Sequence, residues 1–225
     1  MEFTALIANL GKDAAGIIAE TLLPFPTTAE RVQEALREIG VDGLRYEEVI
    51  VKEYSIGVEG VAPILGEYAH IDELNYLAHR LEQLSSEDIR KYIAAVRHGD
   101  YASDVQDLIN LTYPCNLEQF TLLPDVQGYE DYGRYLVDTR RDFSLPRGAR
   151  IYFDYEEYGE TTAINENGTL TSQGYIFHDR SASFQEIYDG REIPQAYRVF
   201  QYPLKAKIQN HETKHSRDSP GRRRP

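Results

Sequence analysis

The sequence predicts an α+β fold made of three small units in the order α+β, helical, α+β. Apolar and polar residues alternate over the first sixty residues and again after Pro146, as expected for half-buried strands. Between these regions, residues 61–145 carry apolar residues at the helical period of 3.6. Glycine and proline become frequent from Gly57 to Gly66, and we place the first boundary there. The predicted domains are therefore 1–60, 61–145 and 146–203, followed by a tail, 204–225.

The first unit combines strands with one helix. Thr27 and Glu30 have the spacing of a capping box, so a helix should begin there, and Gly40 should end it. The predicted strands are Phe3–Ala8, Ile17–Phe25 and Tyr46–Tyr54.

The central unit should be helical. Asp72, Ser85 and Ser103 each precede an apolar stripe at helical spacing, and each is a residue type that caps helices. Gly99 should end the second of these helices, and Gly128–Asp138 is predicted to form a fourth. The two-residue gap between the first two helices predicts an antiparallel pair.

The third unit returns to strand-like segments, and the chain then changes character. The predicted strands are Ile151–Tyr158, Gly168–Phe177, Phe184–Tyr188 and Arg198–Tyr202. An Asn167-Gly168 turn should open the second of them. Residues 204–225 are polar and rich in proline and arginine, so we predict a disordered basic tail, either solvated or able to tether nucleic acid.

The charge balance limits the partners of the protein. The 225 residues hold 24 basic and 37 acidic side chains, a net charge of −13. The tail carries seven of the basic and two of the acidic residues, so residues 1–203 carry a net charge of −18. We therefore expect that the folded part binds neither nucleic acid nor an anionic membrane directly. It should instead be attracted to basic surfaces.

The sequence favours a protein without metal or cofactor in a reducing compartment. Cys115 is the only cysteine, which excludes an internal disulfide and a thiolate metal cage. His211 and His215 are the only histidines four residues apart, and they lie in the predicted tail. No signal peptide and no apolar stretch of about 20 residues is present, so we expect a cytoplasmic protein.

No enzyme motif is found. The chain has no glycine-rich phosphate loop, no nucleophile elbow and no zinc-binding helix motif. Adjacent carboxylates occur at Glu47-Glu48, Glu130-Asp131 and Glu156-Glu157, but none of these pairs is marked out as a general acid and base. An acidic hydrolase stays open as an alternative, as does a scaffold protein that does not compete with DNA.

The segment Ile151–Gly159, with the sequence I-Y-F-D-Y-E-E-Y-G, alternates aromatic rings with carboxylates. As a strand it places tyrosines and carboxylates on one face; as a helix it places Ile151, Tyr155 and Tyr158 on one face. Either form offers apolar area beside negative charge. The segment therefore fits a surface that associates with a partner, or an edge element whose tyrosines complete a core.

Several segments together resemble the ArdA family of bacterial antirestriction proteins. They are I-A-N-L-G-K at Ile7–Lys12, I-D-E-L-N-Y-L at Ile71–Leu77, Y-F-D-Y-E-E-Y-G at Tyr152–Gly159 and L-T-S-Q-G-Y-I-F at Leu170–Phe177, with the proline-flanked Phe25. The resemblance implies an elongated, non-catalytic homodimer whose carboxylates imitate DNA phosphates. Such a protein occupies the DNA-binding groove of a type I restriction-modification enzyme, or of another nucleic-acid-binding defence complex. The implied dimer interface is Tyr152, Phe153, Asp154, Tyr155 and Tyr158.

The charge suffices for such mimicry. Duplex DNA carries about one charge per 1.7 Å of its axis, so the roughly 36 charges of two chains correspond to about 60 Å of duplex. The carboxylates that we expect to be exposed and to form this surface are Glu47, Glu48, Glu53, Glu59, Glu67, Asp72, Glu73, Glu82, Glu87, Asp88, Asp104, Asp107, Glu118, Asp125, Glu130, Asp131, Asp138, Glu156, Glu157 and Glu160.

Overall fold

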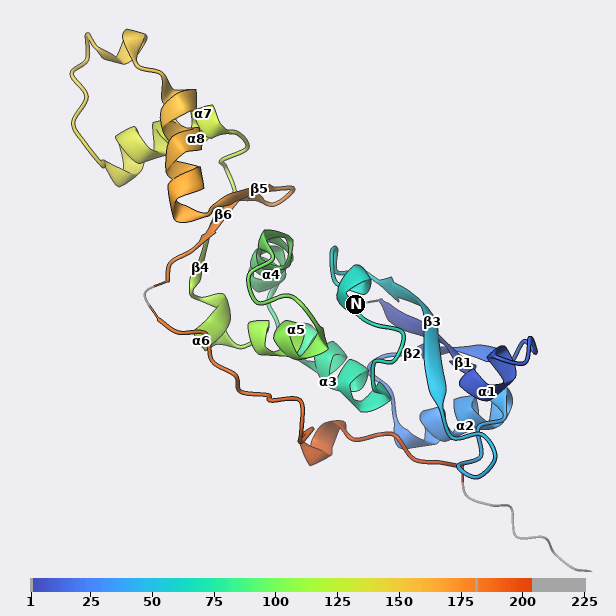
Figure 1. Ribbon diagram of the computed structural model, residues 1–225. Helices are drawn as coiled ribbons and strands as arrows, with labels where there is room; N and C mark the ends of the chain where they lie inside the picture. The colour runs from blue at the N-terminus through green and yellow to red at the C-terminus, as the bar shows by residue number, and fades with distance from the viewer. Residues whose placement is uncertain (1, 181, 204–225) are drawn as a thin grey trace, which may run out of the picture.

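A computed structural model shows an elongated α+β protein (Figure 1). It describes residues 2–180 and 182–203, so the predicted tail and its two histidines lie outside the described residues. The strands are β1 Phe3–Asn9, β2 Glu20–Pro24, β3 Val49–Ile56, β4 Phe120–Leu123, β5 Thr169–Thr171 and β6 Gly174–His178. The α-helices are α1 Leu10–Asp13, α2 Ala29–Ile39, α3 Ile71–Glu82, α4 Ser86–His98, α5 Val105–Leu111, α6 Pro114–Leu117, α7 Tyr129–Tyr135 and α8 Tyr155–Glu166. Short 3₁₀ turns are η1 Ala62–Ile64, η3 Arg150–Tyr152 and η4 Gln195–Tyr197, and a π-helical turn, η2 Leu136–Arg140, follows α7.

The described residues form two separate antiparallel sheets, and Ser172 in the turn of the second donates a hydrogen bond to Glu59, just after the first (3.3 Å). The first has the strand order β2-β1-β3, with Leu6 opposite both Leu22 and Glu53. The second has the order β4-β6-β5 and joins strands that are about fifty residues apart in the chain. Each sheet is short, because its strands are three to eight residues long.

Two hydrophobic clusters fill the described part of the chain. The larger one runs without interruption from the first sheet through α2, α3, α4 and α5 to β4 and β6. The smaller one joins α7 and α8 to β6 through Tyr132, Ala163 and Tyr175. Strand β4 and helix α7, which the sequence places in the central unit, thus pair with elements of the third unit. The division into three domains stays a prediction.

Helix boundaries follow local capping, with small shifts. Ser85 caps α4 and Gly99 ends it, as predicted, and Gly40 ends α2 in the left-handed conformation. Three predicted caps are wrong, because a neighbour does the capping: Thr28 caps α2 in place of Thr27, His70 caps α3 in place of Asp72, and Asp104 caps α5 in place of Ser103.

Three predicted strands are wrong. Residues 151–158 form the turn η3 and the start of α8, because the Asp154 side chain accepts a hydrogen bond from the Glu157 amide and begins a helix. Residues 184–188 and 198–202 belong to no sheet, and the chain bends at Ile187. Their backbone groups bind side chains of the helices instead. The predicted strand 168–177 is present as the hairpin of β5 and β6, and Asn167 ends α8.

Among the described residues, no helix combines the length and the apolar character needed to cross a membrane.

Candidate functional site

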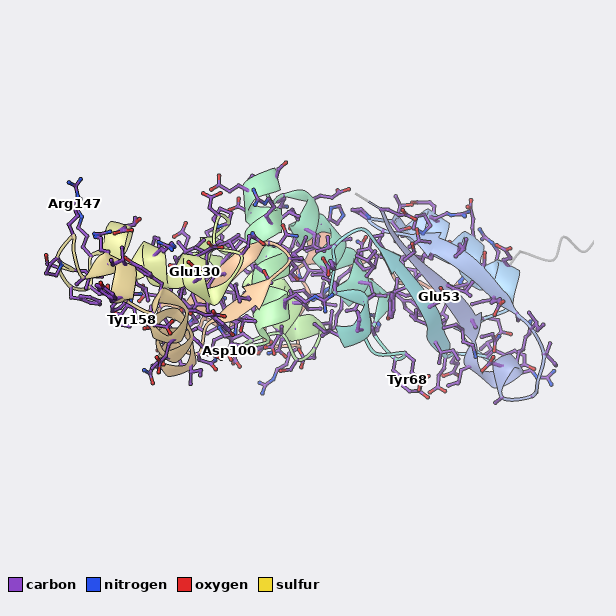
Figure 2. All side chains as sticks on the ribbon, turned by 90° about the horizontal axis from the view of Figure 1, so that it is seen from above. Glu53, Tyr68, Asp100, Glu130, Arg147 and Tyr158 are labelled. Atoms are coloured by element: carbon purple, nitrogen blue, oxygen red, sulfur yellow. The ribbon has the colours of Figure 1, made fainter. Side chains whose placement is uncertain are left out.

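Exposed carboxylates occur along the whole length of the molecule. Figure 2 shows the long axis, with Arg147 at one end, Glu53 on the first sheet towards the other end, and Glu130 in the half that contains Arg147. Of the carboxylates expected to be exposed, those that are exposed are Glu47, Glu48, Glu53, Glu59, Glu67, Glu82, Glu87, Asp104, Glu118, Asp125, Glu130, Asp131, Asp138, Glu156, Glu157 and Glu160. They lie on β3, on helices α3, α4, α7 and α8, on the turn η2, and on the segments that connect the elements, so the negative charge is spread out. We call this set the acidic surface.

Few of these carboxylates have a basic neighbour. In the described part of the chain, Glu59 pairs with Arg97 (2.7 Å), Glu130 with Arg134 (2.6 Å) and Asp138 with Arg150 (2.5 Å). The other members of the acidic surface form no ion pair with a described residue. Most of the acidic surface is therefore not neutralised by direct ion pairs with described residues.

The electrostatic effect of this surface shows in two side chains. The pKa of the Tyr68 hydroxyl is raised, chiefly by repulsion from the neighbouring Glu67 carboxylate. The hydrogen bond and charge of Arg97 lower the pKa of Glu59, which therefore stays ionised. Glu130 and Asp138 are the other two members of this surface that have a guanidinium partner among the described residues.

Four of the expected carboxylates are engaged within the fold. Asp72 is buried, at 8% exposure, and its Oδ1 accepts hydrogen bonds from the backbone of Val199 and Phe200. The expectation that it is exposed is wrong, because the returning C-terminal segment covers it. The partly buried carboxylates are Glu73, which accepts from the Tyr188 hydroxyl, Asp88, which accepts from Ser85, and Asp107, which accepts from the Ser103 amide.

The five interface candidates have different environments. Tyr152 is 84% exposed, while Phe153 and Tyr158 pack edge-on against each other and are partly buried. Asp154 is the N-cap of α8. Tyr155 is 7% exposed, and its ring lies under the Arg134 guanidinium, 4.5 Å away. Tyr152 is thus free for a partner, whereas Tyr155 is used inside the protein.

Ile151 belongs to the aromatic and acidic segment but is absent from the dimer interface that the family resemblance implies. It is 78% exposed and adjoins Tyr152, and both residues line an open groove of 670 Å³ together with Arg134, Arg150 and Glu156. Its position inside the aromatic and acidic segment was the only available signal. An exposed isoleucine beside an exposed tyrosine forms an apolar spot rimmed by charge.

Helices α7 and α8, which carry residues of this groove, pack with their backbones in close contact. A Cβ atom at Gly133 would lie 1.9 Å from the Tyr155 carbonyl oxygen, and one at Gly159 would lie 2.0 Å from the Tyr129 carbonyl oxygen. Only glycine fits at these two positions, because the neighbouring atoms are backbone and cannot rotate away. The Glu166 carboxylate, bound by the hydroxyls of Tyr132 and Tyr175 and by Arg140, fixes the other end of α8.

The described residues contain no group of three or more His, Cys, Asp and Glu side chains arranged to hold a metal ion. The adjacent carboxylates Glu47-Glu48, Glu130-Asp131 and Glu156-Glu157 are all exposed.

The fold and the acidic surface define an elongated α+β protein whose exposed carboxylates are spread along its length. The family model of the antirestriction protein (ArdA) matches residues 5–177 of this chain. The chain therefore belongs to the ArdA antirestriction protein family, which confirms the resemblance and implies an antirestriction function. Among curated proteins, no relative matches this chain.

Proposed function

We propose that this protein is a non-catalytic DNA mimic that occupies the DNA-binding groove of a type I restriction-modification enzyme. The observation that supports this best is the acidic surface, which extends along an elongated molecule and has few basic neighbours. A DNA-binding groove presents lysines and arginines spaced to contact phosphates. Carboxylates spread over a similar length can take the place of the phosphates and contact the same lysines and arginines. On this proposal the folded part does not itself bind nucleic acid.

Binding of this kind is governed by long-range attraction. Attraction between opposite charges accelerates the encounter of the two proteins. Dissolved salt weakens this attraction, because exposed charges are screened within about 8–10 Å. Individual surface carboxylates contribute little, so the effect is collective. Another nucleic-acid-binding defence complex has the same kind of basic groove and is the second candidate target.

A competition titration tests the proposal. We expect the protein to displace labelled duplex DNA from a purified type I enzyme at near-stoichiometric amounts. Displacement should weaken as the salt concentration rises from about 50 to about 200 mM. The measurement is fluorescence anisotropy of the DNA at several salt concentrations. Absence of displacement at low salt would exclude this target. Binding that is insensitive to salt and to competing duplex would favour the scaffold alternative.

We also propose that the protein is a homodimer, joined through the end of the molecule that α7 and α8 form, around Ile151 and Tyr152. We expect Tyr152→Asp to convert the dimer to a monomer, because it places a charge where an exposed aromatic ring would be buried by the partner. Sedimentation equilibrium measures the change. Tyr68→Asp is the matched control, since Tyr68 is 69% exposed but lies elsewhere on the molecule, as Figure 2 shows. Equal behaviour of both variants would contradict this interface.

A further inference from the structure

The buried polar side chains of this protein serve mainly one segment. Residues 183–203, here called the C-terminal strap, run past α6, α5 and α3 to the region of α2 (Figure 1). The strap lies outside residues 5–177, which the family model matches. Apart from the turn η4 it has no helix or strand. The polar side chains beneath it include Asp72, Asn75, Asn110 and Asn116, all buried.

Asparagines of the helices bind the first half of the strap. Asn110 Oδ1 accepts from the amides of Ile187 (3.0 Å) and Tyr188 (2.8 Å), and its Nδ2 donates to the Tyr188 carbonyl (2.8 Å). Asn116 makes the same two-way contact with Gln185, at 2.8 Å to the amide and 2.9 Å to the carbonyl. Each asparagine thus supplies the hydrogen-bond acceptor and donor that the backbone of a paired strand would otherwise supply.

Helix α3 binds the second half. Asp72 Oδ1 accepts from the amides of Val199 (2.6 Å) and Phe200 (2.7 Å), and Asn75 donates to the Tyr197 carbonyl (3.0 Å). All these contacts are with the strap's backbone. These four side chains therefore recognise backbone groups of the strap, which do not depend on the identity of its residues.

Aromatic side chains of the strap supply the apolar anchors. Tyr197 stacks on Tyr76 with ring centroids 4.4 Å apart, and Tyr188 meets the same ring edge-on. Tyr188 is 3% exposed. Beyond these anchors, the Tyr202 hydroxyl donates to the Glu47 carbonyl (3.0 Å), so the strap reaches from the helices to the segment that leads into β3 of the first sheet.

We propose that Asp72, Asn75, Asn110 and Asn116 form a binding site for a peptide backbone, and that the strap is its intramolecular ligand. Occupied in this way, the site clasps the first sheet to the helices and holds the carboxylates of both at fixed separations. A rigid array loses less entropy on binding than a hinged one. The effect on inhibition rests on the proposed function, whereas the clasp itself does not.

Hydrogen–deuterium exchange on the full chain tests the clasp. We expect Asp72→Ala to accelerate exchange of amides in residues 197–203 at least tenfold, while β1 and α4 keep their wild-type rates. Glu82→Ala is the matched control, because Glu82 lies on the same helix, is exposed and carries the same charge. Unchanged strap exchange, or acceleration spread equally over β1 and α4, would overturn the proposal. If Asp72→Ala does not fold, Asn116→Ala gives the same test at residues 183–188.

Competition against duplex DNA then tests the consequence. We expect Asp72→Ala to weaken displacement about tenfold and Glu82→Ala about twofold or less, although both remove one negative charge. Equal loss in the two variants would show that the clasp does not position the acidic surface. If the wild-type protein displaces no DNA, the proposed function is contradicted. The hydrogen exchange experiment still tests whether Asp72 holds the strap in place.

Discussion

Replacing Gly159 with alanine should weaken the packing of α8 against α7 and lower the free energy of unfolding of the protein by about 3 kcal/mol. The added Cβ would lie 2.0 Å from the Tyr129 carbonyl oxygen and 2.8 Å from the Gly133 amide nitrogen. Both are backbone atoms of α7, so no side-chain rotation relieves the clash and the two helices must separate. Separation exposes Tyr132, which is completely buried in the smaller cluster.

Thermal denaturation followed by circular dichroism, with hydrogen exchange of residues 129–166, measures this loss. Gly148→Ala is the control in the same part of the chain, because nothing lies within 4 Å of its added Cβ. We expect that control to change stability by less than about 0.5 kcal/mol. A Gly159→Ala protein as stable as the control would show that α7 and α8 do not depend on this close approach.

Neutralising the acidic surface in blocks should weaken inhibition step by step. The first block is Glu47, Glu48 and Glu53, near the first sheet, and the second is Glu156, Glu157 and Glu160, on α8; none forms an ion pair with a described residue. We expect each triple Glu→Gln change to reduce affinity for the target about tenfold. The slope of log affinity against log salt should become shallower by about three, one for each lost charge.

Fluorescence competition at four or five salt concentrations gives both quantities. Glu156 and Glu157 lie in the first turn of α8, where negative charge stabilises the helix by about 0.3–1 kcal/mol, so each variant's melting temperature is measured alongside. Arg147→Gln is the control of opposite sign and should leave affinity unchanged or raise it. An all-or-none loss from a single Asp→Asn or Glu→Gln change would contradict mimicry and favour the acidic hydrolase.

Sequence patterns predicted the elements whose signals are local. Helix α4 has its cap Ser85, its apolar stripe and its terminal Gly99 within fifteen residues, and it forms as predicted. The strand assigned to residues 151–158 failed because alternation of aromatic and acidic residues fits two periods over so short a segment. The hydrogen bond from the Glu157 amide to Asp154 decides for the helix.

Strand β4 was missed for a different reason. It has only four residues, and its partner β6 lies about fifty residues further along the chain. A segment this short has little preference of its own, so its conformation comes from the strand beside it. The same holds for α7 against α8, whose pairing depends on two glycines that sequence patterns did not connect.

The sequence by itself determined the excess of acidic residues, the helices α2, α3 and α4 and the resemblance to an antirestriction family, because composition, apolar period and motif order can be read along the chain. Tertiary structure alone decided which carboxylates remain at the surface. Asp72 has the residue type and the neighbours of an exposed helix cap, yet it binds backbone amides 127 and 128 residues away. Burial of a polar group depends on a partner brought by folding, and that partner leaves no mark in the local sequence.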